Sequence, residues 1–336
     1  MTTHKHMASA AEVAKLAGVS RSAVSRTFTP GSSVSQRTRK KVMMAAEALD
    51  YHVNHLARGL SKAESRPVCI LGANLNSPFQ ARLLDILTQQ LQQNGRAVMV
   101  INTAGGDESS DAALKQTLNY RAAATIVLTG TPHSSLIETC IQSGQQVILV
   151  NRAGQFTGAE HITLDYSSAM CSAHHTLQQA GCRRLAVISS TIRSPSLLTR
   201  EKLFMQAAEQ AEQPCELLRA GPTRYETGCQ AARQLMAQHM RPDGIFCVTD
   251  LIACGFIDTV RHEFGLNIPE DLCVIGFDNI EQAGWLGYQL TTYEQPLQDM
   301  VDAILERLQP SQEENRDLKI SVFHAKPIWR KTVRKR

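Results

Sequence analysis

The pattern of apolar positions divides the chain into two parts with different periods. Over residues 9–53, apolar residues recur at helical spacing and predict three short helices. From Pro67 onward, short apolar runs alternate with helical patterns, which predicts strands alternating with helices. This alternation is typical of an α/β fold with parallel sheets and right-handed crossovers.

The first predicted helix opens at Ser9, a residue suited to cap a helix N-terminus. It ends at Gly18, which tolerates the left-handed conformation of a helix C-terminus. A second helix follows after a short turn with Ser20 as its cap, and a third begins after Ser35. Two helices joined by so tight a turn cross steeply, as in a helix-turn-helix. The residues predicted to form their buried faces are Ala10, Val13, Ala14, Ala17, Ala23, Val24, Phe28, Val42, Ala45, Ala46 and Leu49.

The second helix carries a small, polar and cationic face. Arg21 and Ser25 are four residues apart, as are Ser22 and Arg26, so the two pairs share one side of the helix. Arginine can bond guanine edges and serine can bond a base or a phosphate, which suits a helix in the major groove of DNA. Cations also crowd the start of the third helix, where they oppose its dipole and indicate a polyanionic partner. They are Arg37, Arg39, Lys40 and Lys41.

Charge is distributed unevenly along the chain. Residues 1–62 contain ten Lys or Arg and three acidic residues, whereas the remainder contains 25 basic and 28 acidic residues. A basic module on a slightly acidic body fits nucleic acid at one end only. With 336 residues, 43% of them hydrophobic, the chain is long enough for two or three domains with sizeable cores.

Three segments, EVAKLAGVSRSAVSRTF, VSQRTRKKVMMAAEALDY and NHLARGL, resemble the DNA-binding headpiece and hinge of the lactose-repressor (LacI/GalR) family. The run from Glu12 to Leu60 follows that pattern almost without gaps. The resemblance implies a homodimer that reads a pseudo-palindromic operator in double-stranded DNA. The contacts expected in the major groove are Arg21, Ser22 and Arg26 at bases, and Ser20 and Ser25 at phosphates.

Residues 54–66 are expected to form a hinge and linker. Asn54 can cap a short helix ending at Leu60, but a helix so short barely holds alone in water. The family implies that it folds only on operator DNA, where two copies pack together and wedge a leucine into the minor groove. The matching residue is Leu60, with Ala57 at the helix contact and Arg58 near the groove. The alternative is a flexible linker with an incidental leucine.

The rest of the chain is predicted to form two similar α/β lobes, which resemble the periplasmic-binding-protein fold that the family implies. In that fold the chain crosses between lobes three times, here near residues 163, 291 and 322. The last helix, at 296–308, is therefore expected to return to the first lobe. The predicted domains are a headpiece at 8–53, the hinge and linker at 54–66, and an effector-binding and dimerisation domain at 67–333, with lobe 1 at about 67–162 and 292–322 and lobe 2 at about 163–291 and 323–333.

Ligands bind outside the carboxyl ends of parallel strands, and between lobes where there are two. Polar residues just past the predicted strand ends are therefore the candidates, among them Arg152 and Asp278. The resemblance singles out Arg200, where the family has an R-x-x-G-F motif, and Asp278, in the G-F/Y-D motif. In sugar-binding members these two residues bond adjacent hydroxyls. Asp250 could equally be the N-cap of the helix that it begins, and Asn76 could equally be a turn residue, without contacting a ligand. The full set of expected ligand contacts is Asn76, Phe79, Asn151, Arg152, Arg200, Asp250 and Asp278.

Two positions depart from the family pattern. Leu203 stands in place of a glycine, and Thr249 in place of the commoner asparagine. Arg152 and Arg200 could therefore clamp a carboxylate or phosphate rather than a neutral sugar, since guanidinium groups match both anions. The effector stays open between a sugar, a sugar acid and a sugar phosphate. The sequence does not specify whether it acts as inducer or corepressor, nor which operator the protein reads.

Other classes of protein fit less well. A solute-binding protein of a transporter would have similar lobes, but MTTHKHMASAAEVAK lacks the apolar core of a secretory signal and precedes a basic headpiece. An enzyme is not indicated, because the chain has no G-x-G-x-x-G after a strand, no phosphate-binding loop and no nucleophile elbow. The pair His262-Glu263 lacks the second histidine of a zinc-protease helix.

Cysteines and apolar runs add little to this interpretation. The nine cysteines are scattered without a C-x-x-C pair, so neither a disulfide framework nor a metal site is expected, and no cofactor is indicated. No run of about 18 apolar residues could span a membrane. No leucine heptads follow residue 333, which favours a homodimer. We therefore expect a cytoplasmic transcriptional repressor whose operator affinity is controlled by a small sugar-like or sugar-acid effector.

Overall fold

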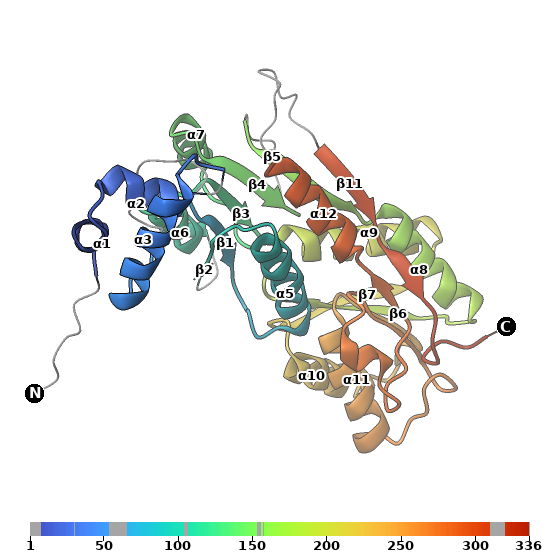
Figure 1. The fold of residues 1–336 in the computed structure, drawn as a ribbon. Coiled ribbons are helices and arrows are strands. Elements are labelled where there is room, and N and C mark those ends of the chain that lie inside the picture. The colour runs from blue at the N-terminus through green and yellow to red at the C-terminus, as the bar shows by residue number, and fades with distance from the viewer. Residues whose placement is uncertain are drawn as a thin grey trace, which may run out of the picture. The chain divides into compact units, whose positions relative to one another are not determined.

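The computed structural model describes residues 8–29, 31–53, 66–103, 107–152, 156, 158–309 and 320–335. The chain forms two compact units that meet in sequence between Arg66 and Pro67. Figure 1 shows the first unit in blue and the second in the colours from teal to red. Within the described ranges, no helix is both long enough and apolar enough to cross a membrane.

Three helices with the predicted caps form the described part of the first unit. The Ser9 hydroxyl accepts from the Glu12 N–H, while the Glu12 carboxylate accepts from the Ser9 N–H, which makes a capping box. Gly18 ends the first helix with a φ of 63°. Ser20 and Ser35 cap the next two helices through their side chains. The helices are α1 (Ala10–Ala17), α2 (Arg21–Thr27) and α3 (Gln36–Ala48).

A small apolar core holds these helices together. Val13, Val24 and Val42, one from each helix, are fully buried. Phe28 packs against Tyr51 at the edge of this core, with ring centroids 5.6 Å apart. The buried faces predicted from helical spacing are therefore confirmed at their central positions. The remaining buried members are Ala14, Ala17, Ala45 and Ala46.

The second unit contains two parallel sheets, and the part of the chain built on the larger sheet is called lobe 1. Alternate residues of its strands face opposite layers of helices. Val68 and Ile70 pack against α5 and α12, while Cys69 and Leu71 pack against α6 and α7. Its strand order is β11-β5-β4-β3-β1-β2. The elements are β1 (Val68–Gly72), α5 (Pro78–Gln93), β2 (Val98–Asn102), α6 (Asp107–Asn119), β3 (Ala124–Val127), α7 (Ser134–Gln142), β4 (Gln146–Val150), β5 (Glu160–Asp165), α12 (Leu297–Arg307) and β11 (Ile320–His324).

Lobe 2 is built on a four-stranded parallel sheet of order β7-β6-β8-β9. Two of its helices, α10 and α11, approach so closely that only glycine fits at the crossing. A Cβ at Gly228 would lie 1.9 Å from the Ile252 carbonyl oxygen, and one at Gly255 would lie 1.9 Å from that of Tyr225. The elements are α8 (Ser167–Gln179), β6 (Leu185–Ser190), α9 (Pro195–Gln210), β7 (Cys215–Gly221), α10 (Tyr225–Met236), β8 (Gly244–Cys247), α11 (Asp250–Glu263), β9 (Cys273–Ile275) and the 3-10 helix η2 (Glu281–Gly284).

The chain passes between the lobes along β5, β10 and β11. β5 and β11 pair in the lobe 1 sheet as far as Asp165 and His324, so the crossings expected near 163 and 322 fall inside these strands. β10 (Thr292–Glu294) pairs antiparallel with β12 (Lys326–Ile328). After lobe 2, α12 returns to pack beside α5 on lobe 1 (Figure 1). The predicted α/β class with parallel sheets is confirmed.

Candidate functional site

The exposed side of α2 is polar and cationic. Arg21, Ser22, Ser25 and Arg26 are all exposed, as the helical spacing predicted. The Ser20 and Ser22 hydroxyls lie 2.8 Å apart, and Nε of Arg26 donates to the Ser22 carbonyl at 3.4 Å. In the part of the chain that the structure describes, neither arginine forms an ion pair with a carboxylate. Both guanidinium groups can therefore bond an acceptor from outside the molecule.

The cations at the start of α3 divide into two kinds. Nη1 of Arg39 donates to the Thr27 carbonyl at 3.1 Å and ties α3 to the end of α2. Arg37, Lys40 and Lys41 are exposed. Arg39 thus has a structural contact, whereas the other three can neutralise phosphates of a polyanion.

The hinge candidates Asn54, Ala57, Arg58 and Leu60 lie outside the described residues. Their expected contacts with the minor groove stay a prediction.

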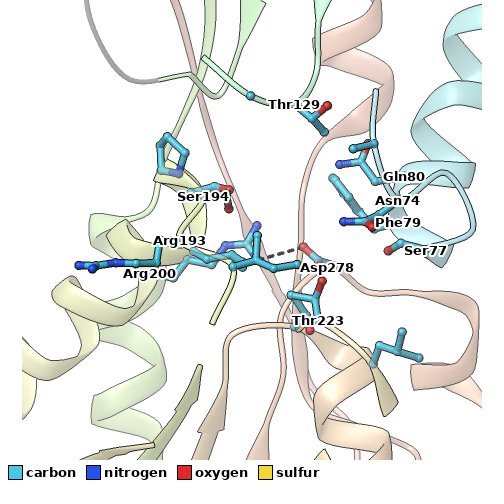
Figure 2. Close-up of a pocket in the computed structure, with 18 of the residues that line it drawn as sticks. Asn74, Ser77, Phe79, Gln80, Thr129, Arg193, Ser194, Arg200, Thr223 and Asp278 are labelled. Carbon is cyan, nitrogen blue, oxygen red and sulfur yellow. Dashed lines mark hydrogen bonds and ion pairs between the residues drawn. The ribbon is translucent and has the colours of Figure 1, made fainter. Parts of the chain in front are cut away.

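A cavity of about 500 Å³ lies where the carboxyl ends of seven parallel strands meet. The segments after β1, β3 and β4 line it from lobe 1, and those after β6, β7, β8 and β9 line it from lobe 2. In Figure 2, Phe79 and Gln80 lie on one side and Ser194 and Arg200 on the other, with Asp278 between them. The cavity has the place and size of a small-molecule site in a two-lobed α/β protein.

The lining combines three kinds of surface. Phe79, Leu251 and Ile280 offer apolar area, Thr129 and Thr223 offer hydroxyls, and three arginines offer guanidinium groups. A small molecule with an apolar ring face and several hydroxyls would match this mixture. Among the described residues, no three His, Cys, Asp or Glu side chains gather where they could hold a metal ion.

Arg200 and Asp278 form a buried ion pair in the lining. Nη1 of Arg200 lies 3.2 Å from Oδ1 of Asp278 and donates to the Val248 carbonyl at 2.8 Å. The guanidinium carbon lies 3.8 Å from the centroid of the Phe277 ring and 5.1 Å from that of Tyr166. The exposed fractions of Arg200 and Asp278 are only 3% and 7%. Figure 2 marks their contact with a dashed line.

The environment of Asp278 keeps its second oxygen available. Burial raises the pKa of Asp278, and the charge of Arg200 opposes that effect. Gln295 donates to Oδ1 at 2.8 Å, the same oxygen that faces Arg200, so Oδ2 can accept from a ligand hydroxyl. The φ angles of Asp278 and Asn279 are 113° and 48°, values that L residues seldom adopt and that concentrate at functional sites.

Arg152 reaches the cavity from the end of β4. Its Nε donates to the Val150 carbonyl at 2.9 Å, and its Nη1 donates to the Gly130 carbonyl at 3.4 Å. Burial lowers the pKa of Arg152 to about 10, so the side chain is still charged at neutral pH. Both acceptors are carbonyl oxygens, and no carboxylate of the described residues forms an ion pair with this guanidinium.

Phe79, Arg152, Arg200 and Asp278 line the cavity, but Asn76 and Asn151 do not. Asn76 is exposed in the turn before α5. Asn151 uses its side chain within the fold.

The side-chain oxygen of Asn151 accepts from the Leu164 N–H at 2.8 Å, and its own N–H donates to the Ile162 carbonyl. Asn151 therefore joins the end of β4 to β5. This contact is structural, and the ligand contact predicted for Asn151 from the sequence stays a prediction.

Asp250 also lies outside the lining and is fully buried. Oδ2 accepts from the Ile280 N–H at 3.0 Å, and Oδ1 accepts from the Thr292 hydroxyl at 2.5 Å. A Cβ at Gly276 would lie 2.1 Å from Oδ1, so the carboxylate fills the space that this glycine leaves. Burial raises the pKa of Asp250 to about 7. Thr249, not Asp250, occupies the N-cap position of α11.

Several lining residues were not among the predicted contacts. Thr129 and Thr131 follow β3, Arg193 and Ser194 follow β6, and Thr223 follows β7. The signal that could have found them is the rule that selected Arg152 and Asp278, namely a polar residue shortly after a predicted strand.

Comparisons with known proteins match two regions of the chain. Residues 10–54 match bacterial regulatory proteins of the lacI family, and residues 174–333 match a periplasmic binding protein-like domain. The catabolite control protein A of Priestia megaterium is 27% identical, over 88% of this chain and 90% of the relative. The ribose operon repressor of Haemophilus influenzae is 28% identical, over 93% of this chain and 95% of the relative. The repressor PurR of Klebsiella pneumoniae is 25% identical, over 97% of each chain.

Solved structures show the same fold. A lac repressor dimer bound to operator and an anti-inducer matches with a TM-score of 0.84 and 21% identity, over 97% of this chain and 99% of that chain. A LacI family regulator from Enterococcus faecium with bound ribose matches with a TM-score of 0.68 and 19% identity, over 80% of this chain and 98% of that chain.

Proposed function

Because the chain belongs to the lacI family of bacterial regulatory proteins, we propose that it is a transcriptional repressor whose affinity for operator DNA is controlled by a small effector. Named relatives that span nearly the whole chain are repressors, and the function is regulation rather than catalysis. The observation that carries the proposal is the presence, in one chain, of an exposed cationic helix face and a polar cavity between two lobes.

The face of α2 would read the operator in the major groove. Arg21, Ser22 and Arg26 would contact base edges, because their side chains are exposed on one side of the helix. Ser20 and Ser25 would hold phosphates. Asn54, Ala57, Arg58 and Leu60 would form the hinge contacts in the minor groove, with Leu60 as the wedge.

The cavity would bind a sugar-like or sugar-acid effector. Phe79, Arg152, Arg200 and Asp278 are the predicted contacts that line it. Residues from both lobes surround the cavity. A ligand that bonds both lobes therefore stabilises one arrangement of the lobes over others. This difference in affinity between two states is how an effector would change the grip on DNA.

A homodimer would present two copies of α2 to the two halves of a pseudo-palindrome. In lobe 2, Leu286 is 95% exposed and its neighbour Trp285 is 50% exposed, an apolar surface that a second copy would cover. A protein that binds chromosomal operators in bacteria would work in the cytoplasm. Sedimentation of the full chain tests the assembly, and a monomer at micromolar concentration would contradict it.

The DNA-binding proposal can be tested with a site selected by the full chain from random double-stranded DNA. We expect a pseudo-palindrome. Arg26→Ala should weaken binding to that site by about 1–3 kcal/mol, or roughly five- to 150-fold, because a guanidinium contact to a base edge is lost. Its affinity for random DNA should fall much less.

Arg37→Ala is the matched control, since Arg37 is an exposed cation of the same unit on a different helix. It should weaken binding to selected and random DNA alike. The slope of log affinity against log salt concentration should fall by about the value of one phosphate contact. Equal loss on both kinds of DNA for Arg26→Ala would show that Arg26 contacts only phosphates. A chain that selects no site at all would contradict the proposed function.

A further inference from the structure

The cavity lining carries more positive charge than its ion pair accounts for. Arg152, Arg193 and Arg200 contribute guanidinium groups, and Asp278 contributes the only carboxylate of the lining as described. Asp278 lies 3.2 Å from Arg200, so these two charges compensate one another. The lining therefore keeps two cations beyond the pair.

Neither of these two cations has a carboxylate partner in the described ranges. Arg152 is held by two carbonyl oxygens, which bond its N–H groups without neutralising it. Arg193 is exposed beside the cavity and forms no ion pair with a described residue. A partly buried charge without a counter-charge is unfavourable in the empty protein, so a bound anion would relieve a cost already present.

Helix dipoles add to this field. The N-cap residues of α5, α9 and α11 are Ser77, Ser194 and Thr249, and all three line the cavity. None of them uses its side chain to cap its helix. Each N-terminus carries about half a positive charge and unpaired N–H groups, which favour anions.

Three buried polar atoms of the lining also lack partners within the described structure, namely Nε of Arg200, Oε1 of Gln80 and the hydroxyl oxygen of Thr249. Nε of Arg200 has no acceptor, although the residue is only 3% exposed. The hydroxyl oxygen of Thr249 is likewise buried without a hydrogen bond. Native proteins seldom leave such groups unsatisfied, so these atoms indicate that a polar ligand completes the site.

A neutral sugar would satisfy only part of this arrangement. Its ring could lie against Phe79, and its hydroxyls could bond Asp278 and Thr129. It would leave Arg152 and the N-termini of α5 and α9, whose first turns contain no acidic residue, without a negative charge. A hydroxylated molecule with one anionic group would use both parts of the site.

We propose that the effector is a small hydroxylated anion, whose carboxylate or phosphate lies near Arg152 and the N-termini of α5 and α9 while its hydroxyls bond the Arg200–Asp278 pair. The inference rests on the proposed function, because it names the chemical class of the ligand that controls the repressor. Carboxylate and phosphate share the recognition chemistry, since guanidinium forks and N–H groups bond either.

The test measures binding to the full chain by calorimetry at constant ionic strength, with matched charged and neutral probes. The pairs are D-gluconate with D-glucose, D-galactonate with D-galactose, and D-ribose 5-phosphate with D-ribose, together with inorganic phosphate alone. We expect at least one charged probe to bind about tenfold or more tightly than its neutral partner. Binding of the selected operator is measured on the same preparation.

Arg152→Gln should remove that preference, and Arg193→Gln, at an exposed position that does not threaten folding, should reduce it. Arg184→Gln, an exposed arginine of lobe 2 outside the lining, should leave it unchanged. Neutral probes that bind as tightly as their charged partners would overturn the inference, as would no binding by any charged probe. If the operator is still bound specifically in those cases, the proposed function stands. If the unaltered full chain does not bind the operator specifically, that result would instead contradict the proposed function.

Discussion

The DNA-binding face of α2 and the effector cavity place their charged groups in opposite environments. Arg21 and Arg26 are exposed on one seven-residue helix, with no carboxylate partner among the described residues. Arg200 and Asp278 are almost fully buried, come from segments far apart in sequence, and are paired before any ligand binds. Recognition on α2 is therefore local, whereas recognition in the cavity depends on the tertiary fold.

Because of this difference, substitutions on α2 should affect binding without affecting stability, whereas substitutions in the cavity should affect both. A substitution on the face of α2 removes a contact with solvent or DNA and leaves the core around Val24 intact. A substitution at Arg200 or Asp278 leaves an uncompensated charge in an apolar environment. We therefore expect variants of the cavity, and not those of α2, to change binding and folding together.

The largest expected effect is that of breaking the buried pair. Asp278→Asn should lower the free energy of unfolding by about 3–5 kcal/mol, because it leaves the guanidinium of Arg200 buried without its carboxylate partner. Arg200→Met should cost less, because burial already raises the pKa of Asp278 and that carboxyl can become neutral. Both tryptophans, Trp285 and Trp329, lie in the second unit, so their fluorescence during urea unfolding of the full chain reports this unit alone.

The double variant Arg200→Met, Asp278→Asn is the control for that comparison. Removing both charges leaves no unpaired ion, so its cost should be well below the sum of the two single costs. Additive costs would show that the pair is not coupled. Equal costs for the two single variants would contradict the expectation that the unpaired Asp278 carboxyl, whose pKa is raised by burial, is the less costly of the two.

Patterns in the sequence could predict the elements but only part of the cavity. Capping at Ser9 and the burial of Val13 depend on residues within one helical turn, so local spacing was enough. The cavity follows from the rule on strand ends, which placed Arg152 and Asp278 in its lining. That rule cannot tell which polar residue after a strand faces the ligand.

Asn151 and Asp250 show why. Both follow a strand, but Asn151 bonds the backbone of β5, and Asp250 bonds Ile280 and Thr292. Their partners lie 13 to 42 residues away in the sequence, so only the tertiary structure reveals them. The contact of Arg200 with Asp278 was likewise not predictable, because the family pattern implied that each would bond the ligand.

A second prediction tests whether charge burial beside the cavity also controls stability. Burial raises the pKa of Asp250 from 3.8 to about 7, so the folded state holds this proton more tightly than the unfolded state. The stability that protonation contributes is full below about pH 4 and is lost as the pH rises through 7. Relative to Asp250→Asn, the free energy of unfolding should therefore fall by about 1.4 kcal/mol for each pH unit in that range.

Asp250→Asn keeps the shape of the side chain, and the Thr292 hydroxyl can reverse its hydrogen bond to accept from the amide. The measurement is urea unfolding of both proteins by tryptophan fluorescence between pH 4 and 8. Parallel pH profiles would show that Asp250 is ionised in the folded protein throughout. An advantage of the aspartate over the asparagine that grows as the pH rises from 4 to 7 would contradict the raised pKa.

The smallest expected effect is a loss of stability in the headpiece, and local interactions should account for it. Ser9→Ala removes the side-chain half of the capping box and should lower the stability of α1 by about 1 kcal/mol. Hydrogen exchange at the Val13 amide of the full chain should accelerate about fivefold, while tryptophan-detected unfolding of the second unit stays unchanged. Ser9→Asp, which keeps a capping oxygen and adds charge favourable at a helix N-terminus, should restore the slow exchange. Faster exchange in both variants would mean that the hydroxyl acts through some contact other than the cap, and the headpiece would then depend on longer-range interactions as the cavity does.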